Sequence, residues 1–261
     1  MQVRSGDTDI IYEVRGKGPD LVLLHPFPAN HEVWSAVAEP LSSVYRVILP
    51  DLRGLGSSGP GEGIATMEKH ANDVMRVCQD AGVERAVFAG NSIGGYILFE
   101  FWRRFRERVS ALILVDTKAS PDTEEARKTR LAAADDVLKR GTEPFINAQL
   151  PKLLGESTRR NRPDKVDQAK KLMMKSSAAG IAAVQRGMAE RPDSTPTLRM
   201  IDVPTLLLVG EEDGVTPAAE MELIHRNVRG SEMRRIPQAG HYSPFERPED
   251  VHRAMREFLR R

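Results

Sequence analysis

Five short apolar runs are the feature of this sequence that most restricts its fold. They are mostly Leu, Val, Ile and Ala, and they lie at Leu21–Leu24, Tyr45–Leu49, Ala86–Ala89, Ala111–Val115 and Thr205–Val209. Runs of this length are typical of strands that are buried on both faces, as in a parallel sheet. Because helical patterns separate most of them, we predict an α/β fold with a doubly wound, mostly parallel sheet.

The segments around these runs complete the predicted core. Residues 8–15 alternate loosely between apolar and polar side chains, which predicts an antiparallel strand at the edge of the sheet. Residues 66–81 predict an amphipathic helix, because one stripe carries Met67, Ala71, Val74, Met75 and Cys78. From about Pro248 the chain predicts another helix.

Residues 118–200 break this alternation, because they contain no strand-like run. Apolar stripes predict charged amphipathic helices around residues 131–138, 146–154, 166–173 and 181–188, and prolines separate them. We therefore predict that residues 118–200 form an all-helical cap. The cap is inserted into a core domain made of residues 1–117 and 201–261.

Composition argues against several other classes of protein. The formal net charge of +1 is too small for a dominant nucleic-acid surface. The sequence has no stretch of 18 apolar residues, so we predict no membrane span. It has no long apolar segment near Met1, so we predict no secretory signal.

A lone cysteine, Cys78, fits a cytoplasmic location. There is no zinc-type spacing, so we expect no metal or organic cofactor. The oligomeric state is not predicted.

The strongest chemical signal is the pattern Gly-x-Ser-x-Gly at residues 90–94. A strand run leads into it, and a helical pattern leads out through Tyr96, Leu98, Phe99 and Trp102. This context predicts a nucleophile elbow, a tight turn that raises Ser92 to the carboxyl edge of the sheet. The helix that follows has its positive dipole end there, which favours a developing negative charge.

A serine hydroxyl needs a general base, and His241 is the best candidate among six histidines. It follows a strand-like run at residues 233–236 and precedes the last helix, so it lies on a loop at the end of the sheet. His70, His225 and His252 lie in helical patterns among charged residues, and we expect them at the surface.

The base in turn needs an acid that fixes its tautomer, and two aspartates follow strand runs directly. Asp213 lies in the turn after residues 205–209, and Asp116 follows residues 111–115. We favour Asp213 and keep Asp116 as the alternative.

An oxyanion requires backbone amide donors. One is the amide of Ile93, the residue after the nucleophile. The other is expected in the loop after residues 21–24, where Phe27 lies between Pro26 and Pro28. Because proline has no amide hydrogen, Phe27 is the residue of these three that can donate.

These motifs resemble those of the α/β-hydrolase fold family with a cap, in its esterase, lactonase and perhydrolase-like branches. The resemblance rests on His25–Pro28, Asp51–Ser58, the Ser92 elbow, Gly210–Pro217 and Gly240-His241. The order Ser92, Asp213, His241 is the order of this fold. The resemblance implies hydrolysis of a small carboxylic ester or lactone through an acyl-enzyme. Pro26 departs from it, since the family loop is usually His-Gly.

Two other functions stay open. Asn91-Ser92 also resembles the elbow of hydrolases that cleave carbon–carbon bonds in ring-fission products, although those carry a tryptophan where this chain has Tyr242. The third possibility is a hydrolase-like receptor that binds a ligand with little turnover. The expected partner is in each case a small molecule, and we predict that the pocket walls include Phe27, Ile93, Val215, Tyr242, Ile146, Leu150, Met173, Ile181 and Met188.

Overall fold

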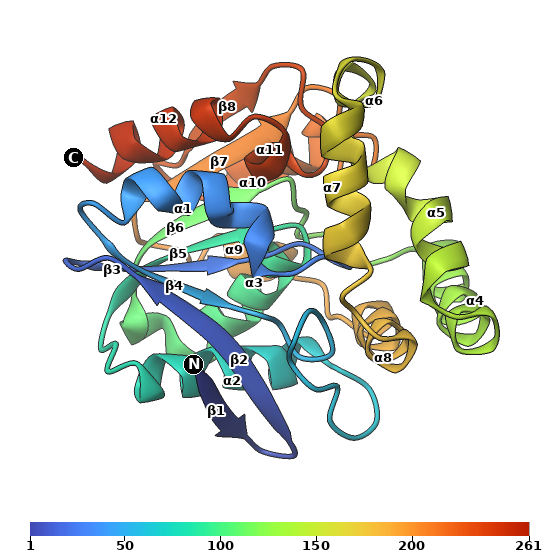
Figure 1. Ribbon diagram of the computed structural model, residues 1–261. Coiled ribbons are helices and arrows are strands. Elements are labelled where there is room, and N and C mark those ends of the chain that lie inside the picture. Colours follow the sequence, from blue (N-terminus) through green and yellow to red (C-terminus); the bar gives the residue numbers. More distant parts are fainter. Residues whose placement is uncertain (261) are drawn as a thin grey trace.

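The computed structural model describes residues 1–260 and contains one eight-stranded sheet (Figure 1). The strand order is β1-β2-β4-β3-β5-β6-β7-β8. β2 is antiparallel to both of its neighbours, β1 and β4, and all pairs among β3 to β8 are parallel. The predicted α/β fold with a doubly wound, mostly parallel sheet is thus confirmed. The strands are β1 Gln2–Ser5, β2 Thr8–Arg15, β3 Asp20–Leu24, β4 Arg46–Pro50, β5 Ala86–Asn91, β6 Val109–Val115, β7 Thr205–Gly210 and β8 Glu232–Ile236.

One expectation about the sheet is wrong. The strand expected at residues 8–15 forms as β2, but it does not lie at the edge. It pairs with β4 on one side and with β1 on the other, so β1 is the edge strand. β1 has four residues and too little apolar alternation to be recognised from the sequence.

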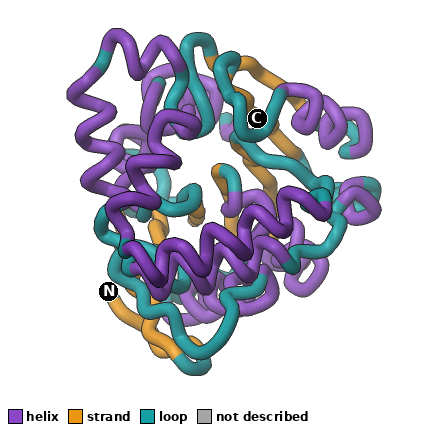
Figure 2. Tube along the Cα trace, turned by 90° about the vertical axis from the view of Figure 1, so that its right-hand side faces the viewer, coloured by secondary structure: helices purple, strands orange, loops and turns teal. Residues whose placement is uncertain are grey.

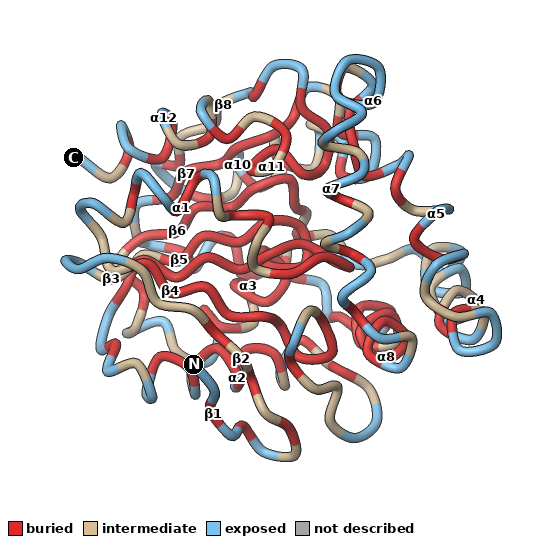
Figure 3. The backbone as a smooth tube through the Cα atoms, viewed as in Figure 1, coloured by how far each residue is buried: buried red, intermediate tan, exposed pale blue. Residues whose placement is uncertain are grey.

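Helices cover both faces of the sheet because side chains alternate along each strand. In β3, Leu21 and Leu23 pack in one apolar cluster with α1 and α12, whereas Val22 and Leu24 pack in the other with α2, α3 and α10. Figure 3 shows the strands buried between these layers. The core helices are α1 Ser35–Leu41, α2 Met67–Asp80, α3 Ile93–Phe105, α10 Ala218–Asn227, α11 Ser243–Glu246 and α12 Pro248–Leu259.

The histidine expected at the surface of α2 is buried instead. His70 has no exposed surface, and neither of its ring nitrogens has a hydrogen-bond partner among residues 1–260. Burial, together with the positive charge of Arg53, lowers its pKa to about 3. Of the other two, His225 is exposed and His252 is half-buried.

Six helices lie between β6 and β7 in the chain, and those from α4 (Glu124–Arg140) to α8 (Ala178–Ala189) form one side of the molecule (Figures 1 and 2). They lie at the carboxyl ends of the strands, since α8 contacts the loop after β4: a Cβ on Gly180 would come within 1.8 Å of the Gly54 carbonyl oxygen. Within residues 1–260, no helix is both long and apolar enough to span a membrane. The six helices are α4 Glu124–Arg140, α5 Thr142–Leu153, α6 Glu156–Asn161, α7 Pro163–Met173, α8 Ala178–Ala189 and α9 Thr195–Leu198.

Candidate active site

Ser92 occupies the turn between β5 and α3 in a backbone conformation that few residues other than glycine adopt. Its φ angle is 57°, in the left-handed region. Two contacts hold it there: its amide donates to the Val115 carbonyl at 2.9 Å, and the Thr117 hydroxyl donates to its carbonyl at 2.7 Å. The turn directs the serine away from the strand axis, as expected for an elbow at the end of a central strand.

The structure brings Ser92, His241 and Asp213 together in one chain of hydrogen bonds. His241 Nε2 lies 2.7 Å from Ser92 Oγ, and His241 Nδ1 lies 2.9 Å from Asp213 Oδ2. All three residues are buried. When Asp213 is ionised, it accepts a hydrogen bond from Nδ1–H, so the Nε2 lone pair is directed at the serine hydroxyl.

The carboxylate of Asp213 is itself fixed by its own turn. Oδ1 accepts hydrogen bonds from the amides of Val215 at 2.8 Å and Thr216 at 3.0 Å. The Thr216 hydroxyl donates to Oδ2 at 2.5 Å and also lies 3.2 Å from His241 Nδ1. Burial works to raise the pKa of Asp213, but His241 and Thr216 outweigh it and hold the pKa below its ordinary value.

Asp116, the alternative acid, is placed differently. It is fully buried and binds the end of β7 and the start of α11: Oδ1 accepts from the Gly210 amide at 2.7 Å, and Oδ2 accepts from the Ser243 hydroxyl at 2.5 Å. Burial and the nearby charge of Asp213 raise its pKa well above the ordinary value. It forms no hydrogen bond with His241, so the structure joins Asp213, and not Asp116, to the imidazole.

The two amides expected to bind an oxyanion have no acceptor of their own. Neither the Phe27 nor the Ile93 backbone amide donates a hydrogen bond within the described chain. The Tyr242 hydroxyl donates to the Phe27 carbonyl at 2.8 Å, so the residue after His241 fixes this loop. The Phe27 ring also packs edge-on against the ring of Phe145 in α5, with 6.0 Å between the two ring centroids.

His25 holds the same loop from below. Its Nε2 accepts a hydrogen bond from the Leu52 amide at 2.9 Å. Nδ1 therefore carries the ring proton and donates a hydrogen bond to the Pro26 carbonyl at 3.0 Å. Burial lowers the pKa of His25 to about 4, so the ring is neutral and suited to accept one bond and donate the other.

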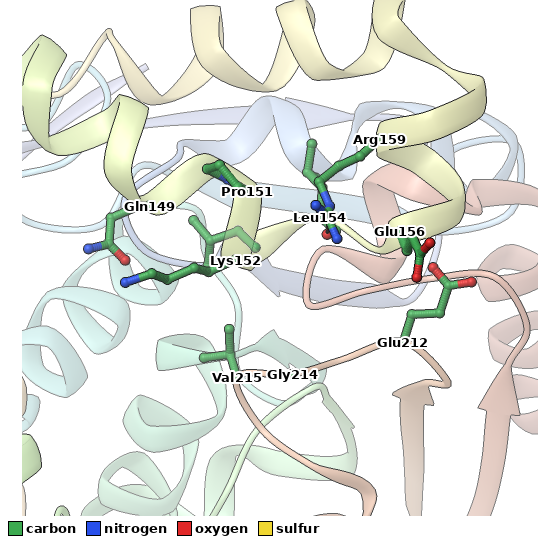
Figure 4. A pocket seen from close by; sticks show the side chains of 10 residues that line it. Gln149, Pro151, Lys152, Leu154, Glu156, Arg159, Glu212, Gly214 and Val215 are labelled. Carbon is green, nitrogen blue, oxygen red and sulfur yellow. Dashed lines mark hydrogen bonds between the residues drawn. The ribbon is translucent and has the colours of Figure 1, made fainter.

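A pocket of about 710 Å³ opens between the α5–α6 segment and the loop after β7 (Figure 4). Val215, predicted as a pocket wall, lines it beside Gly214 and Glu212. The other predicted walls do not line it, and the structure buries them in the apolar cluster that joins helices α4 to α8 to the sheet and its flanking helices; these residues are Phe27, Ile93, Tyr242, Ile146, Leu150, Met173, Ile181 and Met188.

The sequence interpretation did not include three polar residues that contact this site. Asn91 donates through Nδ2 to the His241 carbonyl at 3.1 Å, Thr216 supports Asp213, and Glu246 accepts from amides beside His241. A threonine three residues after an aspartate is a recognisable turn pattern, so Thr216 could have been found. The other two depend on contacts between distant segments.

Acidic and imidazole groups around Ser92 are already paired with each other or with amides. Within residues 1–260, no group of three or more His, Cys, Asp or Glu side chains is arranged to hold a metal ion. That the enzyme requires no metal stays a prediction, which dialysis against EDTA tests.

Comparison with known proteins gives one family and several similar enzymes. A family model described as the alpha/beta hydrolase fold matches residues 19–248. The structure of a thermophilic esterase from Thermogutta terrifontis, with malate bound, is 39% identical and covers 100% of this chain and 98% of its own, with a TM-score of 0.96. A 3-oxoadipate enol-lactonase from Acinetobacter baylyi is 25% identical over 93% of this chain and 89% of its own. A pimeloyl-[acyl-carrier protein] methyl ester esterase from Citrobacter koseri is 29% identical over 91% and 92%.

Proposed function

Because the chain belongs to the alpha/beta hydrolase fold family, we propose that it is a serine hydrolase that cleaves small carboxylic esters or lactones through an acyl-enzyme on Ser92. The observation that carries this proposal is the hydrogen-bonded chain from Asp213 through His241 to Ser92. The similar proteins support ester and lactone substrates, because they are described as an esterase, an enol-lactonase and a methyl ester esterase.

The proposed reaction has two halves. Ser92 Oγ attacks the substrate carbonyl while His241 Nε2 accepts the hydroxyl proton. The amides of Phe27 and Ile93 stabilise the oxyanion, which collapses as the ester C–O bond breaks and the leaving alcohol takes the proton from His241. Water, deprotonated by His241, then attacks the acyl-enzyme, and the carboxylic acid leaves with Ser92 restored. Asp213 stabilises the imidazolium in both halves.

Residues 118–200 act in this proposal as a cap over the site, and residues 1–117 and 201–261 form the core domain. The pocket between α5–α6 and the loop after β7 is the proposed route of entry, since its wall includes Val215, two residues after Asp213. A cap that excludes water from the acyl-enzyme strengthens the electrostatic interactions inside the site. Our prediction of a cytoplasmic location rests on the sequence alone.

Ser92→Ala tests the proposal on p-nitrophenyl acetate. We expect multiple turnovers from the wild type and a loss of several orders of magnitude in the variant, with about 10³-fold to 10⁴-fold catalysis over water persisting from the remaining site. A variant with near wild-type turnover contradicts the assignment of Ser92 as the nucleophile.

A substrate panel separates this function from the alternatives. Esters of increasing acyl length, lactones of increasing ring size and a ring-fission diketone are compared at equal concentration. Cleavage of the diketone in preference to every ester would favour a carbon–carbon hydrolase. A single slow turnover accompanied by a rise in Tm would favour a ligand receptor.

A further inference from the structure

The loop that carries His241 is held by its backbone amides. Three consecutive amides, those of Gly240, His241 and Tyr242, all donate hydrogen bonds. The first and third bind the same carboxylate oxygen, Oε1 of Glu246, at 2.9 and 3.3 Å. The middle one donates to the Leu153 carbonyl of the cap at 3.0 Å. The three amides of the loop around the imidazole are therefore held by one carboxylate and one carbonyl.

Glu246 also reaches the cap itself. Its second oxygen, Oε2, accepts a hydrogen bond from the Gly155 amide at 2.8 Å, in the connection between α5 and α6. This connection packs directly on the base loop: a Cβ on Gly240 would come within 2.2 Å of the Gly155 nitrogen. One side chain thus joins the amides on both sides of His241 to the cap segment that binds the His241 amide.

Burying the Glu246 carboxylate costs free energy, so a purely structural role does not readily account for it. Glu246 is 1% exposed, and backbone amides hold it rather than a cation. Burial raises its pKa, and the Thr158 hydroxyl and the three amides oppose that rise. A buried carboxylate is tolerated only with such donors. An apolar replacement would remove the cost of burial but would leave three amide protons without acceptors.

We propose that Glu246 is a positioning residue for His241, and that through it the Leu153–Gly155 connection of the cap orients the base toward Ser92. The proposal rests on the proposed role of His241 as the general base. It implies that the seating of the cap on the base loop affects the chemical step as well as substrate entry.

Glu246→Gln is the direct test. The amide oxygen can still accept from Gly240 and Tyr242, but its NH₂ group then faces the Gly155 amide, donor against donor; the reversed rotamer places the NH₂ against the base loop instead. Either way the connection is broken on one side. We expect kcat for p-nitrophenyl acetate to fall about 10-fold to 10²-fold with KM nearly unchanged, as for a catalytic group displaced by about 1 Å.

Lys165→Met is the matched control. The Lys165 ammonium of α7 donates to the carbonyls of Phe245 and Glu246 at 2.7 and 3.1 Å, so its loss loosens the same junction without removing an acceptor from the base loop. We expect Lys165→Met to lower Tm, because it removes two partly buried hydrogen bonds. We expect kcat to stay within about twofold of the wild type, because the hydrogen bonds to the amides of Gly240, His241 and Tyr242 are unchanged.

The outcomes separate the two proposals. An unchanged kcat in Glu246→Gln, or an equal fall of kcat in Lys165→Met, overturns the positioning role. If Ser92→Ala retains full turnover, the proposed function itself fails, whatever Glu246→Gln does. Should Glu246→Gln be unfolded by circular dichroism, Glu246→Asp is measured in the same way; it keeps the charge but shortens the reach, and a wild-type kcat in this folded variant also overturns the proposal.

Discussion

Asp213→Asn should cripple the enzyme by reversing one hydrogen bond. Oδ1 of Asp213 accepts two backbone amides, so the asparagine carbonyl oxygen is held in that place. The NH₂ group then takes the place of Oδ2, 2.9 Å from His241 Nδ1. As a donor it forces the imidazole to carry its proton on Nε2, where it can no longer accept one from Ser92.

The size of the loss follows from the rotamer that would preserve function. Turning the asparagine so that its oxygen faces His241 sets its NH₂ against the amides of Val215 and Thr216. Each buried donor without an acceptor costs about 1–3 kcal/mol, so the two cost about 2–6 kcal/mol together. At about 1.4 kcal/mol per tenfold, the productive rotamer is disfavoured about 30-fold to 10⁴-fold. In a serine protease with the same three roles, the equivalent change lowers kcat about 10⁴-fold.

Asp116→Asn is the matched variant, with the opposite expectation. The change leaves the Asp213–His241 contact untouched but removes an acceptor from either the Gly210 or the Ser243 amide. We expect a loss of about 1–3 kcal/mol in the free energy of unfolding, with kcat less than about tenfold lower. Both variants are assayed for kcat on p-nitrophenyl acetate and for Tm. A normal kcat in Asp213→Asn together with a crippled Asp116→Asn would refute the reasoning.

Three further predictions concern stability, the cysteine and metals. The wild type should lose free energy of unfolding between pH 8 and pH 5, because His70 binds a proton in the unfolded chain (pKa near 6.5) but not in the folded one (pKa about 3). His70→Leu should reduce this loss by about 2 kcal/mol in urea unfolding. An unchanged pH dependence would contradict the burial argument. Burial raises the pKa of the Cys78 thiol to about 12, so iodoacetamide should leave turnover intact, and rapid inactivation would count against it. Dialysis against EDTA should not change turnover; a loss that one divalent metal restores would show a metal requirement.

Local patterns in the chain were enough to predict the sheet and the elbow. The apolar runs predicted β3 to β7 to within about two residues, because a strand buried on both faces needs apolar side chains at every position. The elbow was equally visible, since the glycines, the serine and the helix that follows are contiguous in sequence. Helices α4, α5, α7 and α8 were predicted from their apolar stripes, whereas the shorter α6 and α9 have too few residues to show one.

The tertiary structure decided what depends on segments that are distant in sequence. The sequence analysis favoured Asp213 over Asp116, but both follow buried strands, so only the folded chain shows that Asp213 is the carboxylate that contacts His241. His70 lies among charged residues of α2, yet it is buried near Arg53, which lies in the loop between β4 and α2. In the sequence, nothing distinguishes Glu246 from other residues near the last helix. Its contacts with the amides of Gly155, Gly240 and Tyr242 appear only in the folded chain. Periodicity reports which side of an element is apolar, but the partner of a buried polar group is fixed only when the chain has folded.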